Sequence, residues 1–213
     1  MEKSKFSIEK TGKFLREISV VVIGVAITLS VSYWITNRTE KKDMALYLNA
    51  IKLEMEENIK YLDWEADYLE DWENYAIFLQ SHDKKSLNPD SIRYSGGGLG
   101  AVHNMIFQTS AFEMFKTSGA MRLINDKELL QSIWAAYLHL EFCKLRVNEY
   151  FELKREACVK ENQLELDGTP SQIPFYDFFV INTNFGALEE CKDVSNELKA
   201  TIEKLEKSKL IKQ

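Results

Sequence analysis

The sequence predicts an all-α fold in which one N-terminal transmembrane helix is followed by an antiparallel helical bundle with long helices. Three observations lead to this prediction. Residues 18–37 carry no charge, residues 41–81 contain no Gly or Pro, and the whole chain of 213 residues has only 9 Gly and 3 Pro. Because turn-rich β folds need frequent Gly and Pro, this composition favours long helices.

The apolar segment Ile18–Ile35 is predicted to cross a membrane. As a helix it would be about 27 Å long, close to the hydrocarbon thickness of about 30 Å. It is longer than the apolar region of a typical signal peptide, and no small-residue cleavage motif follows it, so we expect an uncleaved anchor. Tyr33 and Trp34 suit the aromatic belt at a membrane interface. The chain then divides into a tail, 1–17, a transmembrane helix, 18–37, and a soluble helical domain, 38–213.

Charge is divided unevenly between the two parts of the chain. Residues 1–43 carry 8 basic and 5 acidic side chains, whereas the rest carry 19 and 28. An acidic domain lacks the clustered basic face that nucleic acids require, so we expect no nucleic-acid partner. The slight excess of basic residues before the span predicts a cytoplasmic N-terminus and a domain on the outer side of the membrane.

Small residues recur every four positions in the span, at Gly24, Thr28 and Ser32. Such a stripe lets two membrane helices approach closely, and hydroxyl groups can form hydrogen bonds between them. We therefore expect the span to associate with a second copy or with the span of a partner. The alternative is that these residues have no packing role, since small residues are common in membrane helices.

Beyond the membrane, apolar residues recur every three or four positions, which predicts three long helices, each with an inward apolar face, and one short helix. The first covers 41–81, the short one covers 101–118 with Gly119 as its C-terminal cap, and the last runs from Gly186 to about Ser208. A capping box formed by Asn125 and Glu128 is predicted to open the remaining long helix, which extends to about residue 161.

Three further segments connect or supplement these helices. The glycine run 96–100 is expected to be a flexible connector, residues 167–174 a turn, and residues 175–181 either a core helix or a short strand. The acidic residues of the first domain helix are expected to lie mainly on its solvated faces; they include Glu54, Glu56, Glu57, Asp63, Glu65 and Asp67.

Two segments resemble a family of uncharacterised single-pass membrane proteins common in the Bacteroidota, named only as a domain of unknown function. Residues Glu17–Trp34 are similar to the family's membrane segment, and residues Ser110–Leu129 are similar to its turn before a long helix. The resemblance implies an anchor in the bacterial inner membrane and a periplasmic helical domain. It implies no activity.

The sequence contains none of the signatures that usually carry chemistry. There is no nucleophile elbow, phosphate-binding loop, Cys-x-x-Cys pair or dinucleotide fingerprint, and the three histidines form no metal-ligand pair. The acidic run 63–73 is read as a solvated helix face rather than a pair of catalytic carboxylates. We therefore expect no catalytic residues, no metal and no cofactor.

The chain has three cysteines, Cys143, Cys158 and Cys191, and an odd number cannot form a complete disulfide framework. Cys143 and Cys158 are expected to share one helix, too far apart to bond. Buried free thiols are the favoured interpretation, and a Cys158–Cys191 or Cys143–Cys191 bridge remains open.

Three aromatic residues of the first domain helix, Trp64, Tyr68 and Trp72, form a stripe. Core packing is the favoured interpretation, and docking of a partner is the alternative. Taken together, the sequence favours a non-enzymatic interaction protein of the bacterial envelope that presents its domain to another envelope protein or to itself. A ligand-binding sensor domain that acts through a partner's span is the second hypothesis, and an envelope hydrolase is the third.

Overall fold

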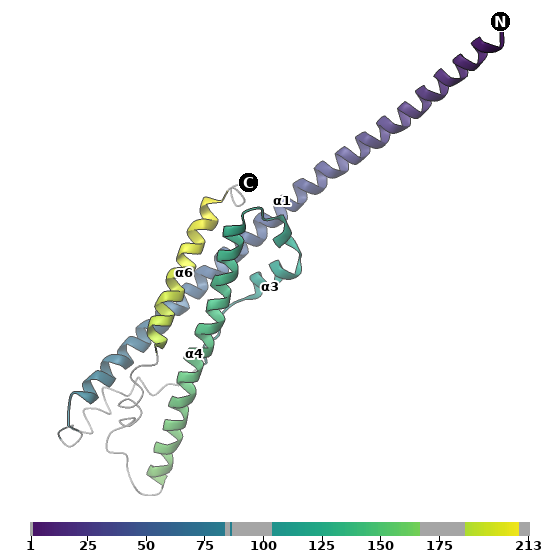
Figure 1. Ribbon diagram of the computed structural model, residues 1–213. Helices are drawn as coiled ribbons and strands as arrows, with labels where there is room; N and C mark the ends of the chain where they lie inside the picture. Colours follow the sequence, from purple (N-terminus) through teal and green to yellow (C-terminus); the bar gives the residue numbers. More distant parts are fainter. Residues whose placement is uncertain (1, 84–85, 87–103, 167–185, 209–213) are drawn as a thin grey trace.

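A computed structural model describes residues 2–83, 86, 104–166 and 186–208, with the side chains of 2–12, 158 and 161–166 excluded (Figure 1). The glycine run 96–100, the predicted turn 167–174 and the aromatic segment 175–181 lie outside the described residues. All described elements are helical, as the sequence predicted. They are α1 (Glu2–Gln80), α3 (Ser110–Thr117), the 3₁₀ helix η3 (Ala120–Leu123), α4 (Lys127–Leu166) and α6 (Ala187–Lys207).

The predicted membrane span and the first domain helix form one continuous helix, α1, with no break between them. Its 79 residues would measure about 119 Å at about 1.5 Å per residue. The N-terminal half extends alone beyond the other helices (Figure 1). In the described part of the chain, α1 is the one helix long and apolar enough to cross a membrane, and none of its apolar window is buried. It can therefore be a membrane anchor or a signal anchor.

The three long helices pack side by side, but they do not alternate strictly in direction (Figure 1). The α6 helix runs against α1, because Lys52 pairs with Glu206 and Glu70 pairs with Lys192. In contrast, α1 and α4 run in the same direction. The bundle is thus antiparallel only with respect to α6, because α4 begins at the same end of the bundle as the buried part of α1: Tyr137 contacts Glu54, and Lys154 further along contacts Tyr68.

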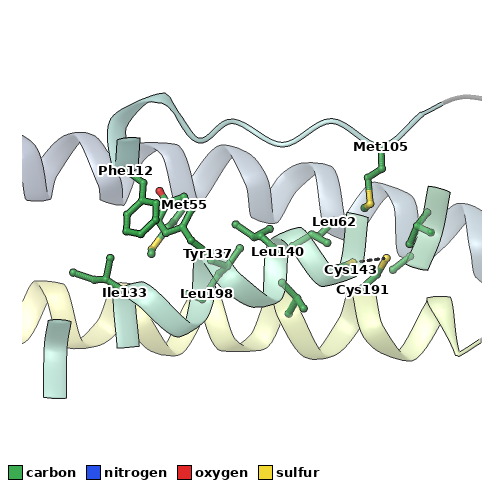
Figure 2. Packing of buried hydrophobic residues seen from close by; sticks show 14 of the residues in the cluster. Met55, Leu62, Met105, Phe112, Ile133, Tyr137, Leu140, Cys143, Cys191 and Leu198 are labelled. Carbon is green, nitrogen blue, oxygen red and sulfur yellow. Dashed lines mark hydrogen bonds between the residues drawn. The ribbon is translucent and has the colours of Figure 1, made fainter. Parts of the chain in front are cut away.

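The predicted apolar faces of α1, α4 and α6 form the core (Figure 2). On α1 this core begins at Met44, which is 3% exposed, and the apolar window of the predicted span contributes nothing to it. Side chains at every helical turn meet along the bundle axis. The fully buried ones include Leu48, Ile51, Met55, Leu62, Leu79, Ile133, Cys143, Val147, Cys191 and Leu198.

Two local predictions need correction, and a third is confirmed. The short helix begins at Ser110 rather than at 101, and residues 104–109 form an extended segment, here called the strap. Asp126 rather than Asn125 caps α4, since its Oδ1 accepts a hydrogen bond from the Leu129 amide at 3.0 Å. Gly119 follows the end of α3 with a φ of 72°, which confirms it as the cap.

Candidate interaction surfaces

The predicted packing stripe of the span lies on the exposed, solitary part of α1. A Cβ added at Gly24 would meet nothing within 4 Å. The Thr28 hydroxyl donates to the Gly24 carbonyl at 2.9 Å, so it is satisfied within its own helix, as a hydroxyl in a membrane span would have to be. Ser32 is also exposed. The structure leaves this face open to a second helix, and the packing role itself stays a prediction.

The predicted interface residues Tyr33 and Trp34 are exposed at the end of the apolar segment. The Arg38 guanidinium lies 5.7 Å from the Trp34 ring centroid, within the range of a cation–π contact. An aromatic ring followed by a cation one turn later suits the boundary between hydrocarbon and headgroups.

The aromatic stripe of α1 runs from the surface into the core. Trp64 is 53% exposed, Tyr68 is half-buried and Trp72 is 1% exposed. The ring centroids of Trp64 and Tyr68 are 6.1 Å apart, and those of Tyr68 and Trp72 are 5.8 Å apart. Core packing is therefore correct for Trp72, and of the three only Trp64 offers most of its surface to a partner.

A fully buried lysine meets the inner end of this stripe. The Lys154 ammonium on α4 donates to the Tyr68 hydroxyl at 3.0 Å and lies 3.4 Å from the Trp72 ring centroid. These contacts partly replace the hydration that burial removes. Sequence reasoning missed Lys154, although it follows Val147 by seven residues and therefore lies on the same helix face. Its contacts join α4 to α1.

Glu54 was predicted to lie on a solvated face, and this is wrong: it is 7% exposed. Its carboxylate accepts hydrogen bonds from the amides of Ala111 and Phe112 at 2.7 and 3.2 Å and from the Tyr137 hydroxyl at 2.6 Å. It thereby caps the first turn of α3 from another helix. Burial, reinforced by the bond to Glu54, raises the pKa of the Tyr137 hydroxyl. Glu65 was also expected outside and is fully buried.

The strap is attached to the bundle by two asparagines. Asn58 on α1 both donates to the Gln108 carbonyl, at 2.8 Å, and accepts from the Gln108 amide, at 2.9 Å. Asn148 on α4 accepts from the Met105 amide at 2.7 Å. The Met105 side chain points into the core (Figure 2). These side chains take the place of a neighbouring strand for the amides of Met105 and Gln108 and for the Gln108 carbonyl.

Two shallow, open depressions of about 360 and 400 Å³ lie between α1 and the segment 104–114. They share Glu57 and Gln108 in their linings, so together they form one surface, here called the strap groove. Most of the residues that line it project from α1, and its open shape differs from the enclosed pocket typical of a small-molecule site. Its exposed apolar side chains are Leu53, Trp64, Ile106 and Met114.

A second apolar surface lies on the side of α4 that faces away from α1 and α6, and it meets α3 at Trp134, whose ring centroid is 5.7 Å from that of Phe112. Trp134, Leu138, Phe142 and Leu145 are 48%, 47%, 54% and 58% exposed. At about 100° per residue they lie roughly opposite the buried face of the same helix. We call these four residues the outer α4 face. Only the inward face of this helix was predicted, although the spacing of four, four and three residues already indicates a second apolar stripe.

Among the residues that the structure describes, no group of three or more His, Cys, Asp or Glu side chains could hold a metal ion. His139 contacts Glu197 of α6, and the Nδ1 atom of His82 lies 2.8 Å from the Phe78 carbonyl. His103 lies outside the described residues. The prominent features of the described surface are thus apolar faces.

Comparisons of this chain with protein-family models, with curated proteins and with solved structures return no match. The resemblance of the two segments to a Bacteroidota family therefore stays a prediction, and function has to be argued from the chain's own surfaces.

Proposed function

We propose that this chain is a membrane-anchored, non-enzymatic interaction protein whose helical domain binds a partner protein through the outer α4 face. The observation that carries the proposal is the apolar face itself. A helix that only covers a core has polar residues on its solvent side, whereas α4 presents an indole, a phenyl ring and two leucines there. Large aromatic side chains are the usual anchors of protein interfaces.

The position of the face fits a partner that also lies at the membrane. Because α1 is continuous, the domain is held at a fixed distance and direction from the predicted span. In this proposal, the N-terminal tail is cytoplasmic, the span crosses the bacterial inner membrane and the domain stands in the periplasm. The Gly24–Thr28–Ser32 stripe is the matching contact within the bilayer.

Charges at the two ends of the face favour a different protein over a second copy. The exposed face is bounded by Lys127 near its N-terminal end and by Glu149 near its C-terminal end, whereas Glu152 pairs with Arg155 of the same helix. Two copies anchored in one membrane point in the same direction, so self-pairing would place like charges opposite each other at both ends. A partner helix with a basic group opposite Glu149 avoids this repulsion.

The proposal is tested by placing a photo-crosslinking amino acid at residue 138 or 142 of the full chain in native membranes. The matched control is residue 196, which is exposed on α6. We expect a discrete adduct with the same partner from residues 138 and 142 and none from 196. An adduct that contains only this chain would mean that the outer α4 face binds a second copy rather than a different protein. The absence of any specific adduct would contradict the proposed function.

A double variant, Leu138→Gln with Phe142→Gln, separates binding from folding. Because both side chains are about half exposed, the unfolding free energy should change by no more than about 1 kcal/mol. Photo-crosslinking from residue 134 should nevertheless fall several-fold, since the apolar contact area is lost.

A further inference from the structure

Two cysteines from different helices meet in the core. The sulfur atoms of Cys143 on α4 and Cys191 on α6 are 3.7 Å apart, and both side chains are fully buried (Figure 2). A disulfide bond has a sulfur–sulfur distance of about 2.05 Å, so closing it needs an approach of about 1.7 Å. Of the two bridges that the sequence left open, the structure brings the sulfur atoms of Cys143 and Cys191 together, and the side chain of Cys158 lies outside the described residues.

We propose that Cys143 and Cys191 form an intramolecular disulfide in the native protein, which joins α4 covalently to α6. The oxidant is a protein or small-molecule disulfide. One cysteine thiolate attacks that disulfide to form a mixed disulfide, and the second cysteine displaces the oxidant's remaining thiol. Two electrons and two protons pass to the oxidant, which leaves as two thiols.

Because both thiols are buried in the folded bundle, the thiol–disulfide exchange has to take place before folding is complete. In the folded bundle neither the Cys143 nor the Cys191 sulfur is exposed to an oxidant. The hydrogen bond to Cys143 and burial both raise the pKa of the Cys191 thiol, so the reactive thiolate is scarce after folding. The exchange therefore belongs to the stage at which α6 docks on α1 and α4. Once formed, the bond is shielded from reductants by the same packing.

The proposal specifies the compartment as well as the bond. Disulfides of this kind persist in the periplasm and outside cells, whereas cytosolic thiols are kept reduced. The bond therefore requires the domain to lie on the oxidising side of the membrane. It does not depend on whether the outer α4 face binds a partner.

The test counts free thiols of the full-length chain in intact cells. Cells are quenched in acid, the protein is denatured, and thiols are labelled with a maleimide mass tag, with and without prior reduction. We expect one tag before reduction, on Cys158, and three after it. Cys158→Ser is the matched control and should give none before reduction and two after. Three tags on the unreduced wild-type chain, or a mapped linkage that contains Cys158, would overturn the proposal.

A second measurement tests the geometry in the purified full chain. After reduction, unfolding and refolding with oxidised glutathione, the peptide containing Cys143 should be recovered linked to the peptide containing Cys191. A bond that closes a loop of this length, 48 residues, should raise the Tm by about 5–15 °C. Cys143→Ser should show no such shift on oxidation. Failure to recover the linked peptide would contradict the proposed pairing independently of the compartment.

Discussion

At the scale of single residues, Glu54 holds three parts of the domain together. It lies on α1, caps the first turn of α3 and accepts a hydrogen bond from the Tyr137 hydroxyl on α4. Its removal leaves two amides and a buried hydroxyl without their acceptor. Glu54 is thus a structural carboxylate that replaces a local capping residue, because the N-cap residue Thr109 makes no capping hydrogen bond with its side chain.

Replacing Glu54 should destabilise the fold strongly. We expect Glu54→Ala to lower the free energy of unfolding by about 3 kcal/mol, and Glu54→Gln by less, because the amide oxygen can still accept one bond. Denaturant unfolding followed by circular dichroism measures both values. Glu57→Gln is the control, since this exposed residue should change stability by no more than about 0.5 kcal/mol. Equal effects at residues 54 and 57 would contradict the assigned role.

The raised pKa of Tyr137 predicts a loss of stability in alkali. The folded state holds this hydroxyl protonated, while the unfolded chain releases the proton near its ordinary pKa of 10.0. The unfolding free energy should therefore be unaffected by this group below about pH 10 and should fall above it, by about 1.4 kcal/mol per pH unit. Tyr137→Phe should reduce that slope. Phe112→Leu, which disturbs the ring stacked on Tyr137, should leave the slope unchanged.

At the scale of elements, the continuity of α1 is the feature with the clearest mechanical consequence. The predicted span and the first bundle helix share one backbone, so a rotation or tilt in the membrane is transmitted directly to the domain. No other described helix touches the region between residues 13 and 35 closely enough to bury it. The stiffness of this exposed region therefore depends on the α1 helix alone.

A proline at the junction should uncouple the two halves. In Asn37→Pro, a backbone donor is lost and the ring clashes with the preceding turn, which kinks or breaks a helix. With spin labels at the exposed positions 16 and 57, we expect the distance distribution to broaden and shift relative to the wild-type chain. Asn37→Ala is the matched control and should leave it narrow. An unchanged distance distribution in the proline variant would contradict the inference that the α1 helix alone fixes the span relative to the domain.

At the scale of the whole molecule, the predicted anchor does not contribute to the folding stability of the bundle. The first core residue on α1 is Met44, and the apolar window of the predicted span is entirely exposed. The apolar surface of the predicted span therefore contributes nothing to the folding of the domain in water. An exposed apolar surface of this length is what a membrane span would present to lipid.

Removing residues 1–37 should consequently release a stable domain. We expect the shortened chain to be soluble without detergent and to keep its helical circular dichroism, with a denaturant midpoint close to that of the full chain. The full chain should remain in the membrane pellet after an alkaline carbonate wash. If the full-length protein is recovered in the soluble fraction after that wash, the predicted membrane anchor is wrong.

Much of the fold follows from local periodicity. The buried faces of α1, α4 and α6 match the predicted apolar positions, because a helix needs only its own spacing to define an inward side. The cap at Gly119 was predicted for the same reason. The strap was not, since nothing within residues 104–109 indicates that Asn58 and Asn148, both distant in sequence, supply its hydrogen-bond partners.

The sequence by itself determined the helical class, the single apolar anchor and the inward faces of the long helices, because these depend on composition and spacing along one segment. Only the tertiary structure decided that α4 runs with α1, that Glu54 and Lys154 are buried, and that Cys143 meets Cys191. Each of these depends on which helix becomes a neighbour. A side chain on a neighbouring helix can stabilise a buried charge or lie next to a thiol. The local sequence pattern does not identify which helix that neighbour will be.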